Sequence, residues 1–188
     1  MTLNTKGTNV TTSDDLTVGK LLLAEYDRVK EEQKTRIGFR DNLLYVTLAA
    51  MVTVLIGAAQ TRQPALLLAL PAATSVLGWT YLANDQKISA IGRYVRTDLG
   101  SRLATLTGEQ ESPFRWESAH RGDSRRKQRK IIQCAVDLIT FIAVPIASLA
   151  TFWVYGAESS LSVIISILEA LAVTILAVQI IQYADIAE

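Results

Sequence analysis

Apolar residues are concentrated in four blocks separated by polar segments, over residues 42–60, 64–83, 131–155 and 161–183. A stretch of about 20 apolar residues is what an α-helix needs to cross the hydrocarbon core of a bilayer. The first two blocks contain no charged residue, whereas a helix of a soluble bundle carries a polar face at a period of 3.6 residues. We therefore expect an all-α integral membrane protein, with four transmembrane helices in two hairpins over residues 42–83 and 131–183.

Lysine and arginine are distributed very unevenly around these blocks. Seven precede the first block and eleven lie between the second and the third, whereas the two short loops hold only Arg62 and none follows Tyr183. Cytoplasmic loops carry the excess of positive charge in membrane proteins. A multi-pass membrane protein with both termini in the cytoplasm is therefore expected. The aromatic residues expected at the interfaces are Tyr45, Trp79, Tyr81 and Tyr183 on the inner side and Trp153 and Tyr155 on the outer side.

The cytoplasmic segments contain two patterns of amphipathic helices. Residues 1–12 are polar without periodicity and are expected to be a disordered lead, and residues 184–188 a short tail. Within residues 13–41, a stripe recurs every three or four positions, and a second stripe lies within residues 84–130, ahead of a basic loop. The stripes consist of Leu22, Tyr26, Val29, Gln33 and Ile37, and of Ile88, Ile91, Val95, Leu99, Leu103 and Leu106. Such helices either lie in the membrane interface or pack against each other and neighbouring subunits.

The composition excludes several classes of protein. The chain has one cysteine, Cys134, and one histidine, His120, which leaves no internal disulfide and no histidine-based zinc centre. No phosphate-cradling glycine loop is present, and we expect neither an enzyme nor a cofactor or metal. The net charge of +1 gives no reason to expect the readout of duplex nucleic acid.

Two acidic residues, Asp137 and Glu169, fall inside the apolar blocks, where ionisable groups are costly and mark functional sites. Helical spacing places them in polar stripes made of Gln133, Asp137, Thr140, Ser148 and Thr151 in the third block and of Ser162, Ser166 and Glu169 in the fourth. One interpretation is close helix packing, with both acids protonated. The other is a water-filled path in an oligomer, in which rings of acidic side chains favour cations.

A basic run directly precedes the third block and includes Arg125, Arg126, Lys127, Arg129 and Lys130. It has the composition of a segment that pairs with anionic lipid headgroups. With Arg93, Arg96 and Arg102 it also has that of a docking site for an anionic cytoplasmic ligand, such as a nucleotide or oligonucleotide.

The segment before the first block contains Glu25-Tyr26, Lys30, Gln33, Arg36-Ile37 and Arg40-Asp41, followed by an apolar hairpin and an amphipathic helix. This order resembles the small multi-span (SLATT-like) membrane effector modules of bacterial nucleotide-signalling defence systems. The resemblance is architectural and covers mainly residues 20–106, and the second hairpin departs from the usual two-span pattern. It implies pore formation or membrane perturbation after a cytoplasmic signal.

These patterns together predict a homo-oligomeric, cation-permeable membrane channel or pore-forming effector, gated by a cytoplasmic anionic ligand. The alternative is a non-conducting structural or scaffolding membrane protein that recruits a cytoplasmic partner. In that case the polar stripes serve packing alone.

Overall fold

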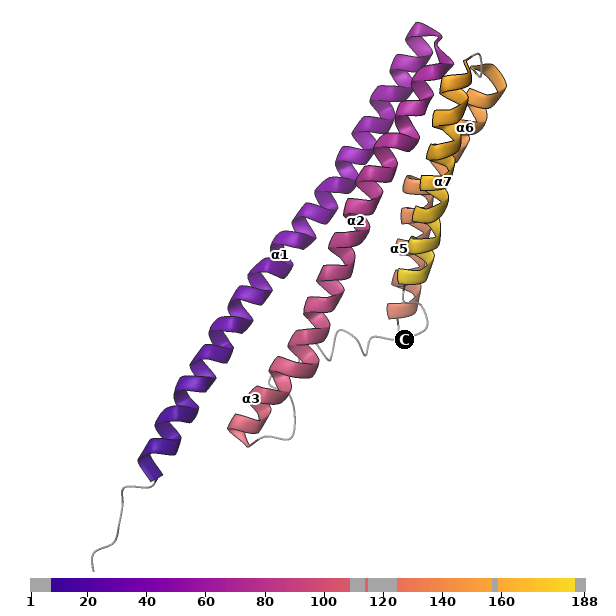
Figure 1. Cartoon of the computed structure of the whole chain (residues 1–188). Helices are drawn as coiled ribbons and strands as arrows, with labels where there is room; N and C mark the ends of the chain where they lie inside the picture. Colours follow the sequence, from indigo (N-terminus) through magenta and orange to yellow (C-terminus); the bar gives the residue numbers. More distant parts are fainter. Residues whose placement is uncertain (1–7, 109–113, 115–124, 157–158, 185–188) are drawn as a thin grey trace, which may run out of the picture. The chain divides into compact units, whose positions relative to one another are not determined.

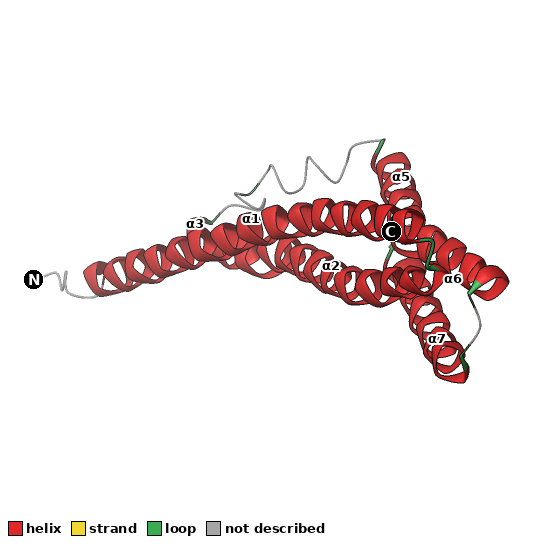
Figure 2. Ribbon diagram, turned by 90° about the horizontal axis from the view of Figure 1, so that it is seen from above, coloured by secondary structure: helices red, strands yellow, loops and turns green. Residues whose placement is uncertain are grey.

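The computed structural model describes residues 8–108, 114, 125–156 and 159–184, and the side chains of residues 8–17 and of Arg126 are outside this description. All the elements within the described residues are helical (Figure 2). The chain order, shown in Figure 1, is α1 (Thr8–Thr61), the 3₁₀ helix η1 (Pro64–Leu68), α2 (Ala69–Tyr94), the π-helical turn η2 (Val95–Leu99), α3 (Gly100–Thr107), α5 (Arg126–Leu138), the π-helical turn η3 (Ile139–Ala143), α6 (Val144–Tyr155) and α7 (Ser160–Tyr183).

Four of the helical stretches are long and apolar enough to cross a membrane, namely Val18–Thr61, Pro64–Thr107, Lys127–Tyr155 and Ser160–Tyr183. The expected all-α fold with four span-length apolar helices is thereby confirmed at the level of length and composition. In the most apolar window of each stretch, the share of residues buried inside the chain is at most 39% and falls to 17% in the first and the last. Most of this apolar surface is therefore not covered by the chain itself.

Helix α1 begins earlier than the sequence pattern indicates. That pattern predicts residues 8–12 in the disordered lead, but the structure places them in α1, while residues 1–7 lie outside the described part. Adding a residue to an existing helix gains one hydrogen bond for each residue fixed, so polar residues can extend a helix that they would not start. The expected boundary between residues 41 and 42 is also absent from the backbone, because α1 contains no proline and runs through it without a break.

The chain divides into two units, Met1–Ile37 with Lys87–Asp123 and Gly38–Gln86 with Ser124–Glu188. In the first unit the two amphipathic stripes pack on each other. Leu22, Leu99 and Leu103 form its buried cluster, against which Tyr26, Tyr94 and Phe114 pack, and the rings of Tyr26 and Phe114 stack at 4.3 Å. The two stripes therefore pack against each other within this unit, and their packing against neighbouring subunits stays a prediction.

Side-chain hydrogen bonds join the described helices of the first unit. The side chain of Gln33, the polar residue that interrupts the first stripe, donates from Nε2 to the carbonyl oxygen of Ile88 at 3.2 Å. The hydroxyl of Tyr94 donates to the carboxylate of Glu25. Polar side chains in and beside the stripes thus fix how the helices pair.

The Tyr94–Glu25 hydrogen bond is expected to make stability depend on alkaline pH. This bond, and to a lesser degree desolvation, raises the pKa of Tyr94 above its ordinary value of about 10. The stabilisation is present below that value and is lost as the pH rises through the raised pKa, because a tyrosinate repels Glu25. We expect Tyr94→Phe to cost on the order of 0.5 kcal/mol at neutral pH, a small effect because solvent screens the pair. Thermal unfolding in detergent should show the wild type and the variant converging at high pH, and a constant difference would contradict this explanation.

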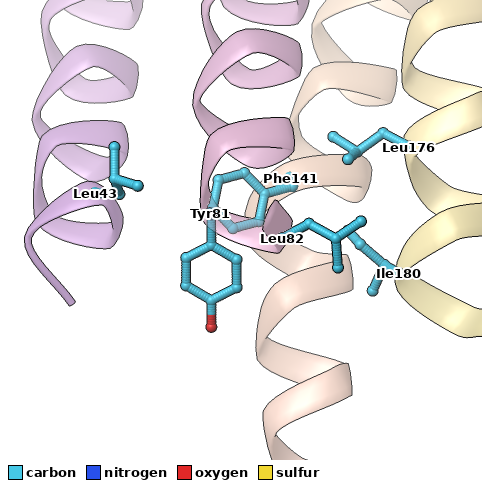
Figure 3. Packing of buried hydrophobic residues seen from close by; sticks show 6 residues of the cluster. All are labelled: Leu43, Tyr81, Leu82, Phe141, Leu176 and Ile180. Atoms are coloured by element: carbon cyan, nitrogen blue, oxygen red, sulfur yellow. The ribbon is translucent and has the colours of Figure 1, made fainter. Parts of the chain in front are cut away.

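The second unit has two buried apolar clusters. The larger consists of Leu43, Tyr81, Leu82, Phe141, Leu176 and Ile180, whose side chains come from α1, α2, η3 and α7 (Figure 3). The smaller joins Met51, Leu67 and Leu70. Gly78 of α2 lies beside the larger cluster, where a β-carbon built on it would come within 2.7 Å of Leu176 and 2.9 Å of Phe141. The absence of a side chain at Gly78 therefore lets these two side chains approach the backbone of α2.

Candidate functional site

A hydrogen-bonded group of three polar side chains joins α2 to α5. Gln133 Nε2 donates to the hydroxyl oxygen of Tyr81 at 2.6 Å and to Asp137 Oδ1 at 2.9 Å. The Tyr81 hydroxyl also lies close to the Asp137 carboxylate. Gln133 and Asp137 are four residues apart and lie on one side of α5, so a single tyrosine reaches both. We call these three residues the Tyr81 network.

Tyr81 is buried, although its place in the sequence predicts an interfacial residue. Its side chain is only 3% exposed, and its ring packs against Phe141 at a centroid distance of 5.1 Å. The other aromatic residues expected in the interfacial belts, Tyr45, Trp79, Trp153, Tyr155 and Tyr183, are all at least half exposed. The difference arises because Tyr81 lies on the side of α2 that faces the other helices of this unit.

A salt bridge that the sequence patterns did not predict lies in the same unit. Arg40 Nη1 of α1 is 2.8 Å from Asp85 Oδ1 of α2, and Arg40 Nη2 is 3.1 Å from Asp41. The sequence contains one weak indication of this pair, because Arg40 and Asp85 lie just outside the first and the second apolar block.

Glu169 lies apart from the Tyr81 network, on α7. It is half-buried, and its Oε2 atom is buried without a hydrogen-bond partner within the described residues. One turn earlier, Ser166 is fully buried, accepts a 2.8 Å hydrogen bond from Trp153 Nε1 and donates to the Val163 carbonyl at 2.7 Å. The two neighbouring polar residues of α7 therefore differ, because Ser166 is satisfied within the chain and one oxygen of Glu169 is not.

The polar stripe expected on one face of the third block is divided between faces. Thr140 and Ser148 are buried, whereas Gln133 and Thr151 are exposed. The π turn η3 contains Thr140 and lies between Gln133 and Ser148, and it adds a residue to the helix, so the residues after it are rotated relative to their places in an ideal α-helix. Three hydroxyls of the expected stripes donate to nearby backbone carbonyls: Ser148 to Pro145 at 2.7 Å, Thr151 to Ala147 at 2.8 Å and Ser162 to Ser159 at 2.8 Å.

The basic residues singled out from the sequence belong to different units. Arg93, Arg96 and Arg102 lie in the first unit, where Arg93 and Arg102 are exposed and Arg102 pairs with Asp98 at 2.7 Å. In the second unit, Arg125, Lys127 and Arg129 are exposed and Lys130 is half-buried around the start of α5, while the side chain of Arg126 lies outside the described residues. Positive charge at the N-terminus of a helix is repelled by the positive end of the helix dipole. An anion bound at the start of α5 would reduce this repulsion.

Fold and site together define a protein whose described residues form four span-length apolar helices, with two acidic residues, Asp137 and Glu169, inside the apolar blocks. Where the structure describes the chain, no three His, Cys, Asp or Glu side chains are grouped so that they would hold a metal ion. Comparison of the chain with protein-family models, with curated proteins and with solved structures gave no match.

Proposed function

We propose that the protein is inserted in the bacterial inner membrane as two transmembrane hairpins, 42–83 and 131–183, with both termini and residues 84–130 in the cytoplasm. Exposed apolar side chains support insertion, since large residues such as Val52, Ile56, Leu168 and Leu171 are about half exposed in the isolated chain. Lipid or further copies of the chain would remove this surface from water. The distribution of Lys and Arg supports the orientation.

Within this membrane protein, we infer a homo-oligomeric, cation-permeable channel or pore-forming effector. The observation that carries the proposal is Glu169, an acidic residue in an apolar helix with one carboxyl oxygen that has no partner in the described residues. An ionisable group in a bilayer is costly unless it meets water or a partner. Copies of Glu169 around an oligomer axis would form a hydrated acidic ring that favours cations, and Asp137 would form a second one.

The basic residues suggest how such a channel would be controlled. An anionic cytoplasmic ligand, such as a nucleotide or an oligonucleotide, would bind to arginine and lysine side chains of the cytoplasmic segments. This is also the role implied by the resemblance to SLATT-like effector modules, which act after a cytoplasmic signal. Anionic lipid headgroups also carry phosphate groups and would compete with such a ligand for the basic residues at the start of α5.

Cation flux from proteoliposomes tests the channel. We expect Glu169→Gln to reduce flux about tenfold, which corresponds to the loss of roughly 1.4 kcal/mol of charge stabilisation in the path. Asp137→Asn should reduce cation selectivity in the same assay. The matched control is Thr174→Val on the same helix, because Thr174 is exposed and its hydroxyl donates to the Ala170 carbonyl of its own helix.

The second candidate function is a non-conducting scaffold, which the internally satisfied hydroxyls of Ser148, Thr151 and Ser166 favour. Absence of flux from correctly folded wild-type protein would support it, with and without anionic lipid and with and without added cytoplasmic extract. Flux that Glu169→Gln leaves unchanged would remove Glu169 from the path.

A further inference from the structure

The third long helix consists of two parts that differ in how they pack. None of the side chains described in α5 is fully buried. Directly after it, η3 and α6 contribute a run of buried residues that includes Thr140, Phe141, Pro145, Ser148, Leu149 and Phe152. One half of this helix is therefore anchored in the unit, whereas the other half contributes only partly buried and exposed side chains.

The junction between the two parts is suited to bending. The π turn η3 spans Ile139–Ala143, and Pro145 follows two residues later. Proline has no N–H group, so the carbonyl of Phe141 lacks the hydrogen bond that it would accept from position 145 in a regular helix. Sharp bends in helices occur at such prolines and π turns. Rotation of α5 about this point would leave η3 and α6 packed.

The Tyr81 network is the attachment that opposes this rotation. Tyr81 is fixed by burial and by its contact with Phe141, and its hydroxyl reaches both Gln133 and Asp137 of α5. Two residues of a weakly buried helix are thus tied to one hydroxyl of a firmly buried residue. The same bonds occupy the Asp137 carboxylate, which a cation in a pore would need to approach.

We propose that α5 is a hinged arm that pivots at η3 and Pro145, and that the Tyr81 network is the latch that holds α5, with its residue Asp137, against Tyr81 of α2. Opening the latch would free Asp137 for the cation path, so the assignment of a gate rests on the proposed channel. The hinge and the latch themselves are properties of the chain and can be tested without conduction.

Cys134 provides a built-in reporter for the arm. It is the single cysteine of the chain, it follows Gln133 directly, and it is half-buried against the larger apolar cluster. Release of α5 would withdraw it from that cluster. The rate of its alkylation by N-ethylmaleimide, a small membrane-permeant reagent, therefore measures how often the arm is open.

The experiment compares Tyr81→Phe with wild type in the full chain in liposomes. The variant keeps the buried ring and removes only the hydroxyl, and we expect alkylation of Cys134 to accelerate about tenfold, as the loss of the hydroxyl's contacts with Gln133 and Asp137 implies. Gln133→Met changes an exposed residue and should also accelerate alkylation, to a smaller extent. Tyr45→Phe is the control, because Tyr45 is 68% exposed and outside the network, and it should leave the rate unchanged.

Cation flux from the same liposomes separates the latch from the channel. Faster alkylation together with greater flux in Tyr81→Phe and Gln133→Met would support both proposals. Faster alkylation with no flux from any protein, wild type included, would support the latch and overturn the channel. An unchanged alkylation rate in both variants would overturn the latch, whatever the flux.

Discussion

Replacing Phe141 by alanine is expected to destabilise the protein by about 3–5 kcal/mol, the usual cost of deleting a buried aromatic side chain. Phe141 is fully buried, it contacts Tyr81, and its ring lies against the backbone of α2 at Gly78. In a bilayer the helices are held together largely by close packing, so a cavity at this point removes contacts between η3 and two other helices. Unfolding in detergent, followed by circular dichroism during titration with a denaturing detergent, would measure the loss.

The matched control for Phe141→Ala is Ile139→Ala, two residues away in the same π turn. Ile139 is 61% exposed, so its truncation removes little contact within the chain. We expect a change below about 1 kcal/mol for this variant, as for most exposed positions. Equal destabilisation by the two substitutions would show that the packing described around Phe141 does not hold the unit together.

Placing a valine at Gly78 should have the second large effect, about 3 kcal/mol of destabilisation, because it forces extra atoms into a filled space. The β-carbon alone would overlap Leu176 and Phe141, at 2.7 and 2.9 Å. Both of these side chains are buried, so they can move only by displacing their own neighbours. The same unfolding titration measures the effect.

Gly57→Val in α1 controls for the change of residue type. A β-carbon at Gly57 meets nothing within 4 Å, so the substitution adds no overlap there. Replacing a helical glycine also lowers the entropy lost on folding, and this variant should be neutral or slightly stabilising. A loss at Gly57 as large as that at Gly78 would mean that helix propensity, and not packing space, accounts for the effect.

Local patterns were sufficient to predict the helices and part of their packing. Apolar blocks and stripes depend only on neighbouring positions, and the stripe residues Leu22, Leu99 and Leu103 are buried together as a pair of amphipathic helices requires. Asp137 and Glu169 were recognisable as unusual because a charge in an apolar block is visible without any knowledge of the fold.

Pairings between helices were not predictable in the same way. Whether Tyr81 reaches Asp137, or Arg40 reaches Asp85, depends on how each helix is rotated about its axis, and the sequence of one helix does not determine that rotation. The close approach at Gly78 is a further example, because the need for a glycine in a helix can be seen only when the positions of the neighbouring side chains are known. The π turns have no sequence signature of their own, although Pro145 follows one of them by two residues.

The π turn at Ile139–Ala143 also makes this part of the chain sensitive to insertions and deletions. A π turn contains one residue more than the α-helical turn that it replaces, and each residue of an α-helix turns the chain by about 100°. Deleting one residue from this stretch would let the helix become regular and would rotate α5 by that angle relative to α6. Asp137 would then leave Tyr81 and meet different neighbours, although no side chain of the network had been altered. The length of this stretch thus sets the surroundings of Asp137 as firmly as the identity of the residues around it.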